Sequence, residues 1–114
     1  MSPIQFYKCL ADDTRLRCLL LIEDQQELCV CELTKALALS QPKVSRHLAL
    51  LREQHVISAR KEGQWMFYRI HDALPEWQKG IIKQTLSEST EYIAPALSLL
   101  NSMGSRPSRQ TACC

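Results

Sequence analysis

The sequence has no long apolar run and no basic leader in front of one. A helix needs about 20 consecutive apolar residues to cross a bilayer, and no stretch of this chain approaches that length. A secretory signal would begin with a positively charged segment, whereas residues 1–8 read Met-Ser-Pro-Ile-Gln-Phe-Tyr-Lys. These absences argue against a membrane partner and predict a cytoplasmic protein.

The chain also lacks a large net charge, which is only +2 over 114 residues. Residues 40–70 nevertheless hold six basic and two acidic side chains, so this segment carries +4 and the remainder about −2. A basic charge confined to one segment is typical of a surface that meets nucleic acid. The chain is therefore not an indiscriminate polycation.

No set of nucleophile, base and orienting group is visible, and no two cysteines have the Cys-x-x-Cys spacing of thiol oxidoreductases. An enzyme is therefore not expected. The chain does have six cysteines, at positions 9, 18, 29, 31, 113 and 114. In a cytosolic protein, cysteines are more often ligands, redox groups or buried fillers than structural disulfides.

Size and composition predict one small domain over residues 1–103, followed by a flexible tail over residues 104–114. At 13.1 kDa and 46% hydrophobic residues, the core is modest, so a dimer partner would help to complete it. The tail contains Gly104, Ser105, Pro107 and Ser108, which favour a mobile segment.

Hydrophobic periodicity predicts a mainly α chain with one small β-hairpin. Asp13 is expected to cap the second helix, Ser40 the fourth, and Pro75 to open the fifth. A break is expected near residues 90–94, because Pro95 lies inside a last apolar stretch. On the hairpin, Met66, Tyr68 and Ile70 are expected to face the core, with Trp65 and Phe67 on the opposite face. The expected helices and strands cover residues 3–10, 13–22, 30–39, 40–51, 57–62, 65–70 and 75–86.

This order resembles the winged helix-turn-helix of the arsenical-resistance repressor (ArsR/SmtB) family. The resemblance rests on Leu10 to Leu16 (Leu-Ala-Asp-Asp-Thr-Arg-Leu), on the Cys-Val-Cys motif at residues 29–31 and on Ser40 to Ile70. It covers roughly residues 5–90. The resemblance implies a homodimeric DNA-binding repressor of about five helices. It further implies that the repressor dissociates from its operator when a metal or metalloid binds.

The fourth helix is the candidate DNA reader, because polar side chains on its outer face can pair with bases or phosphates. The hairpin would act as a wing that meets phosphates or the minor groove. The predicted DNA-binding residues are Ser40, Gln41, Lys43, Ser45, Arg46 and His47 on the helix, and Arg60, Lys61 and Gln64 on the wing.

Cys29 and Cys31 are the candidate metalloid ligands, because thiolates bind soft ions such as As(III), Sb(III), Cd(II) or Zn(II). Residues i and i+2 lie about 200° apart around a helix, so binding through both thiols is expected to distort the start of the third helix. Family members usually carry a third cysteine where this chain has Thr34. Cys113 or Cys114 could supply that ligand, or solvent or an external thiol could complete the site.

Three further groups are given structural interpretations. Cys9 and Cys18 are expected to be core residues, and His71 to be a strand-end residue. The zinc site on the last helix of SmtB-like proteins needs histidines, but none follows Asp72. This argues against a zinc sensor at a dimer interface.

The leading hypothesis is therefore a dimeric repressor that binds double-stranded operator DNA, needs no constitutive cofactor, and is released by arsenite or antimonite. A redox-responsive or Cd/Zn-responsive repressor on the same scaffold and an intracellular metal carrier are the alternatives. The operator sequence, the regulated genes and the preferred metal are not readable from the sequence.

Overall fold

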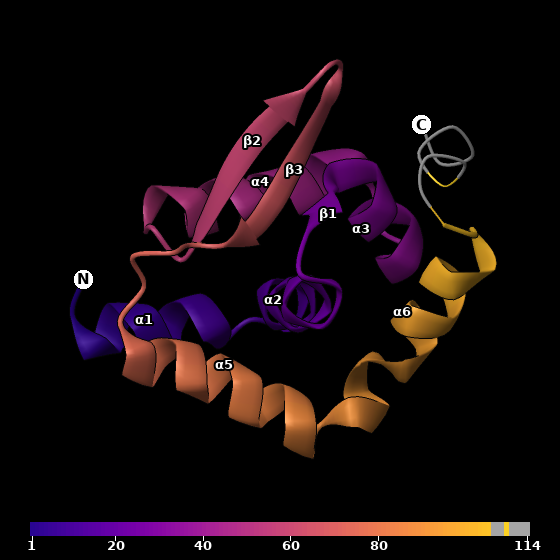
Figure 1. Cartoon of the computed structure of the whole chain (residues 1–114). Coiled ribbons are helices and arrows are strands. Elements are labelled where there is room, and N and C mark those ends of the chain that lie inside the picture. Colours follow the sequence, from indigo (N-terminus) through magenta and orange to yellow (C-terminus); the bar gives the residue numbers. More distant parts are fainter. Residues whose placement is uncertain (106–108, 110–114) are drawn as a thin grey trace.

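The computed structural model describes residues 1–105 and 109, which form six helices and a three-stranded sheet (Figure 1). This is the predicted winged helix-turn-helix order with one more helix than expected. The elements are α1 (Pro3–Leu10), α2 (Asp13–Gln25), β1 (Leu28–Cys29), α3 (Val30–Leu37), α4 (Gln41–Glu53), β2 (Ile57–Glu62), β3 (Trp65–Ile70), α5 (Glu76–Glu88) and α6 (Thr90–Ser102).

Helix α2 is the centre of the core. Five consecutive residues, 18–22, have no exposed surface, because α1, α4, α5 and α6 all pack around this helix. Figure 1 looks along α2 and shows the other elements arranged around it. Cys18 belongs to this run and Cys9 is 3% exposed, so both are core residues as predicted.

Short polar side chains cap the starts of α2 and α4. One of these two caps differs from the predicted residue. Ser40 caps α4 as expected, accepting a bond from the Lys43 N–H. The cap of α2 is Asp12 rather than Asp13, because Asp12 has an extended backbone and its carboxylate accepts from the Arg15 N–H at 3.0 Å. Asp13 is the first helical residue, and its carboxylate binds Arg17 instead.

The wing has three strands where two were predicted. β3 lies in the middle of the sheet, with β2 and the two-residue β1 antiparallel on either side of it. In β1, Leu28 is opposite Tyr68 and Cys29 is opposite Phe67. The β2–β3 turn holds Gly63 at φ +60° between the paired residues Glu62 and Trp65, as tight hairpin turns require.

The expected inner and outer faces of β3 were wrong for Phe67. Phe67 is 5% exposed, whereas Met66, Tyr68 and Ile70 are half-buried. Cys29 of β1 pairs opposite Phe67 in the sheet, and the Arg60 guanidinium lies 4.8 Å from the centre of the Phe67 ring.

The predicted break near residues 90–94 lies at Ser89, where the chain turns from α5 into α6. Pro95 lies inside α6 and does not end it. The structure has six helices among the described residues where about five were predicted. Helix α6 persists because it packs against α3 and buries Ile93, Ala96 and Leu100 along one face.

Helix α3 ends at Leu37, two residues earlier than expected, because Ala38 adopts the left-handed conformation with φ 55° and ψ 42°. The N–H groups of Ala38 and Leu39 bond back to the carbonyls of Lys35 and Thr34. A left-handed residue that is not glycine costs about 1–2 kcal/mol. This turn leads directly into the Ser40 cap of α4.

The expected tail over residues 104–114 falls largely on residues 106–108 and 110–114, which lie outside the described residues. The boundary at residue 103 therefore stays a prediction. Within the described part of the chain, no helix is long and apolar enough to cross a membrane.

Candidate functional site

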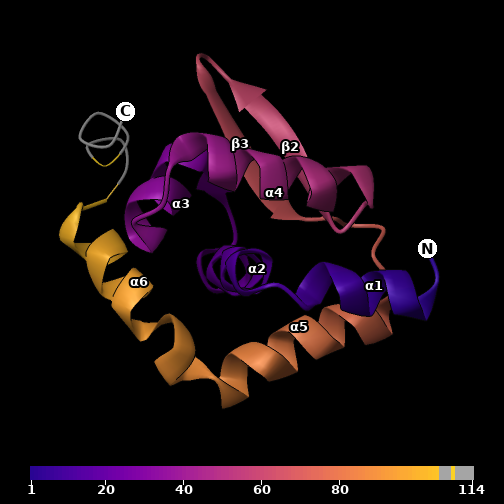
Figure 2. The ribbon, with the colours of Figure 1, turned by 180° about the vertical axis from the view of Figure 1, so that it is seen from behind.

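Helix α4 presents a polar face to solvent. Gln41, Lys43 and Arg46 are exposed, as predicted, whereas Val44, Leu48 and Leu51 are fully buried on the other side. Ser45 is half-buried and accepts a bond from the Gln41 amide at 2.9 Å. Figure 2 shows α4 lying across the front of the molecule, with the β2–β3 hairpin rising beyond it.

His47 does not point freely outward with these residues. Its side chain is 15% exposed. The Nδ1 atom lies 3.3 Å from an Arg15 guanidinium nitrogen and 3.8 Å from an Asp12 carboxylate oxygen. Sequence periodicity could not find this contact, because Arg15 lies 32 residues away in the chain.

The wing residues divide into two groups. Lys61 and Gln64 are exposed beside the turn at Gly63. Arg60 is held by the protein itself: its guanidinium donates to both carboxylate oxygens of Glu27, at 2.7 and 2.8 Å, and to Glu62 at 2.7 Å. Arg60 therefore fastens β2 to the segment just before β1.

The sulfurs of the two candidate ligands lie close together, and Cys31 is disulfide-bonded in this structure. Cys29 is the extended N-cap of α3, with φ −91° and ψ 165°, and its sulfur lies 3.3 Å from that of Cys31. The expectation that a helix would hold these sulfurs apart was wrong, because only Cys31 is inside the helix. Cys29 has no exposed surface, and Cys31 is half-buried.

A buried carboxylate supports this extended turn. Glu32 has no exposed surface, and its Oε1 accepts from the backbone N–H of Cys29 at 2.9 Å. Its Oε2 accepts from Arg109 at 3.1 Å. A buried charge is stable only where it is paired and hydrogen-bonded, so Glu32 and Arg109 hold the start of α3 together.

The thiols border a hollow of about 270 Å³ that they share with the wing. Thr34 does not offer its hydroxyl to the thiols, since that group donates to the Val30 carbonyl at 2.7 Å. Cys113 and Cys114, the other candidate ligands, lie outside the described residues. The hollow is lined by Cys29, Val30, Cys31, Gln64, Trp65 and Met66.

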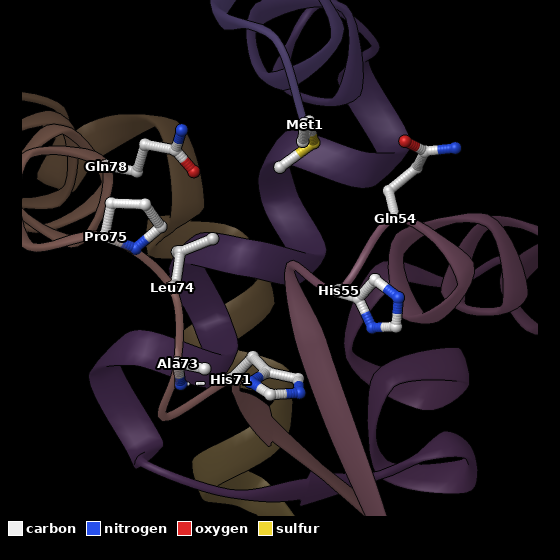
Figure 3. Close-up of a pocket in the computed structure, with 8 residues that line it drawn as sticks. All are labelled: Met1, Gln54, His55, His71, Ala73, Leu74, Pro75 and Gln78. Atoms are coloured by element: carbon white, nitrogen blue, oxygen red, sulfur yellow. Dashed lines mark hydrogen bonds between the residues drawn. The ribbon is translucent and has the colours of Figure 1, made fainter.

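A second hollow of about 270 Å³ lies between the end of α4 and the start of α5 (Figure 3). It contains His55 and His71, whose rings meet edge to face at 5.9 Å between centroids. His71 directly follows β3, and its Nδ1 accepts from the Ala73 N–H at 3.0 Å. Among the described residues, no three His, Cys, Asp or Glu side chains gather in a way that could hold a metal ion.

Comparisons with known proteins agree with this geometry. Residues 12–59 match the model of the family described as bacterial regulatory protein, arsR family. The chain is 49% identical to the arsenic resistance transcriptional regulator ArsR1 of Pseudomonas putida, over 99% of this chain and 88% of that protein. It is 52% identical to the arsenical resistance operon repressor of Escherichia coli, over 74% of this chain and 72% of that protein.

Solved structures give the same result for the fold. The crystal structure of the AntR antimony-specific transcriptional repressor matches with a TM-score of 0.65 and 28% identity. The match covers 77% of each chain. The fold is therefore shared with a structurally known regulator.

Burial changes the acidity of the two core thiols, Cys9 and Cys18. Burial raises the pKa of Cys18 to about 12 and also raises the pKa of Cys9. The thiolate is the form that reacts and binds soft ions. Cys18 therefore stays protonated at neutral pH.

We expect Cys18 to resist iodoacetamide at about pH 8 in the native reduced protein, since a thiol with a raised pKa is un-ionised there. The same residue should react readily once guanidinium chloride unfolds the chain. Peptide mass spectrometry before and after unfolding measures the modification of each cysteine. Rapid labelling of Cys18 in the native protein would contradict its assignment to the closed core.

Proposed function

This chain belongs to the arsR family of bacterial regulatory proteins, and from that premise we propose that it is a dimeric repressor released from operator DNA by As(III) or Sb(III). The relatives are transcriptional regulators, so the chain is a regulator and not an enzyme. The proposal rests above all on the 3.3 Å between the Cys29 and Cys31 sulfurs, next to the helix pair that would read DNA.

DNA reading is assigned to the exposed face of α4 and the tip of the wing. Arg46 can pair with guanine and Gln41 with adenine, whereas Lys43 is a phosphate contact. The hydroxyls of Ser40 and Ser45, near the start of α4, add further groups that can bond a phosphate. Lys61 and Gln64 extend this surface onto the wing.

The two sulfurs lie close enough together for one soft ion to bind both. Their separation is 3.3 Å, and a metal–thiolate bond is about 2.3 Å long. We assign As(III) or Sb(III) as the ion because the relatives are arsenic-resistance regulators. Binding needs both sulfurs as thiolates, so it requires reducing conditions.

Two routes connect the thiols to the DNA face. Helix α3 packs against α4 through the turn at residues 38–40. Cys29 also belongs to β1, which pairs with the wing strand β3. A metalloid bound to Cys29 and Cys31 shifts the equilibrium only if its contacts differ between the DNA-bound and the released states. Both routes end on residues proposed to touch DNA.

A third ligand other than Thr34 would fit beside Cys29 and Cys31. The hollow beside the thiols is large enough for an external thiol or for a cysteine brought in from residues 113 and 114. Thr34 supplies no soft atom. Two protein thiolates are therefore the minimum set, and the tail cysteines are the alternative to an external ligand.

The dimer is assigned to α1 and α5. Ile4, Tyr7 and Trp77 remain 48–63% exposed and adjoin one another through the aromatic contacts of Phe6, Tyr7 and Trp77. Phe6 and Ile82, from the same two helices, are buried within the chain. Exposed aromatic groups of this kind are typical of interface centres, and a two-fold dimer matches an inverted-repeat operator.

Arg46→Ala and Lys43→Ala should weaken operator binding without unfolding the protein, because both side chains are exposed. A guanine-reading Arg46 should lose roughly 1–3 kcal/mol and relax specificity, and a phosphate-binding Lys43 should lower the salt slope by about 1. Fluorescence anisotropy across a salt series measures both effects. Lys83→Ala, an exposed lysine on α5, is the matched control, and equal behaviour of all three variants would exclude α4 as the reader.

Cys29→Ser and Cys31→Ser should still bind the operator but should no longer release it on addition of As(III). Serine loses the soft thiolate and is a favourable N-cap at position 29, so the fold should survive. Gel shifts with arsenite, antimonite, Cd(II), Zn(II) and peroxide, each added separately under matched conditions, measure release. Normal release of both variants by arsenite would place the sensor elsewhere, and release by peroxide alone would favour a redox sensor.

Removing Cys113 and Cys114 should change arsenite affinity less than either serine substitution. Trp65 lines the thiol hollow, so in a Trp77→Phe background its fluorescence reports binding separately from DNA release. X-ray absorption then counts the sulfurs. Three sulfurs in the intact chain and two in the shortened one would make the tail a ligand.

The chain should be a dimer at micromolar concentration by light scattering. Trp77→Glu should raise the dimer dissociation constant by about 30-fold or more, since central aromatic residues contribute about 2 kcal/mol or more at interfaces. Leu99→Glu, on α6 with almost the same exposure, is the matched control. A monomeric parent that still binds the operator tightly would contradict the assignment.

A further inference from the structure

Arg15 joins three helices through one guanidinium group. It lies in the first turn of α2, and its Nε and one terminal nitrogen donate to the carbonyls of Cys9 and Lys8, both at 2.9 Å. Both carbonyls are in the last turn of α1, where carbonyls lack the usual helical donors, although that of Lys8 also accepts from the Ala11 N–H at 3.3 Å. The other terminal nitrogen lies 3.3 Å from Nδ1 of His47 on α4.

The contact fixes the chemical state of His47. A guanidinium has donors only, so Nδ1 of His47 must accept and the ring proton sits on Nε2. Burial and the nearby cations Arg15, Arg46 and Lys43 lower the pKa of His47, while Asp12 opposes them. The ring is therefore neutral at physiological pH, with Arg15 as its partner.

We propose that Arg15 is a positioning residue that sets the orientation of α4 relative to α1, and that His47 acts as its acceptor instead of as a DNA contact. This inference rests on the proposed function. Helix α1 carries the proposed dimer face, and α4 the proposed DNA face. The guanidinium therefore links the surface that joins two copies to the helix that each copy inserts into DNA.

The geometry suits positioning better than it suits DNA binding. The planar guanidinium group of Arg15 donates to two carbonyls and contacts one imidazole, which leaves few of its N–H groups for a phosphate. Operator binding by a dimer depends on the separation of its two recognition helices, which must match about one turn of DNA. A link between α1 and α4 controls that separation without touching a base.

Four proteins test this assignment: the parent, Arg15→Lys, His47→Asn and His47→Phe. The probe is a duplex that the parent selects from a random pool. Asparagine places an acceptor oxygen near the position of Nδ1 and does not titrate, whereas phenylalanine keeps the ring and removes the acceptor. At about pH 8, His47→Asn should bind within about threefold of the parent, and His47→Phe and Arg15→Lys about tenfold more weakly, as loss of a charged hydrogen bond predicts.

The dependence of operator affinity on pH distinguishes a positioning role of the Arg15–His47 bond from a general loss of structure in the variants. The folded pKa of His47 is lowered, so its bond to Arg15 is complete above the ordinary histidine pKa of about 6.5 and is lost as pH falls through the folded pKa. Parent affinity should therefore fall toward about pH 5.5 relative to His47→Asn. A histidine that binds phosphate would do the opposite, since protonation would strengthen its binding.

A half-site spacing series completes the test. The parent should discriminate against a duplex with one base pair inserted between its half-sites, and Arg15→Lys should discriminate less while keeping the same salt slope. Unchanged affinity, spacing preference and pH profile in the variants would overturn the inference, as would an acid-strengthened parent. A parent that selects no duplex would instead overturn the proposed function.

Discussion

The short backbone pairing between β1 and β3 is the constraint on which both candidate surfaces depend. It holds Cys29 extended opposite Phe67, which brings the Cys29 sulfur to 3.3 Å from that of Cys31. The same pairing places the thiols beside Trp65 and Met66 of the wing. Arg60 and Glu27 add a second tie between wing and thiol segment. Cys29 and the wing strands are thus parts of one sheet.

Most of the fold was predictable because its signals are local. The apolar spacing of Val44, Leu48 and Leu51 identified the buried face of α4 and, by exclusion, its polar face. Both long strands were found from their composition and from the glycine between them. The thiol pair and the exposed positions of Gln41, Lys43 and Arg46 followed from residue type and spacing. The roles assigned to these residues remain predictions.

The features that escaped prediction all depend on residues distant in the sequence. A two-residue strand such as β1 has no periodicity, so its pairing with β3 left no signal. Arg60 resembled an ordinary wing cation, but Glu27, 33 residues earlier, occupies its guanidinium. His47 resembled a surface residue until α1 and α2 folded against it. Side-chain type suggests what a group can bind, whereas tertiary contacts determine what remains accessible to bind it.

The left-handed residue at Ala38 has a mechanical consequence. A glycine at this turn would adopt φ 55° without cost and would also reach many other backbone angles. Alanine has few alternatives once its own N–H is bonded to the Lys35 carbonyl and the N–H of Leu39 to the Thr34 carbonyl. The turn between α3 and α4 therefore has little conformational freedom. A rotation at the start of α3 is carried into α4 as rigid-body motion, with little of it absorbed in the turn.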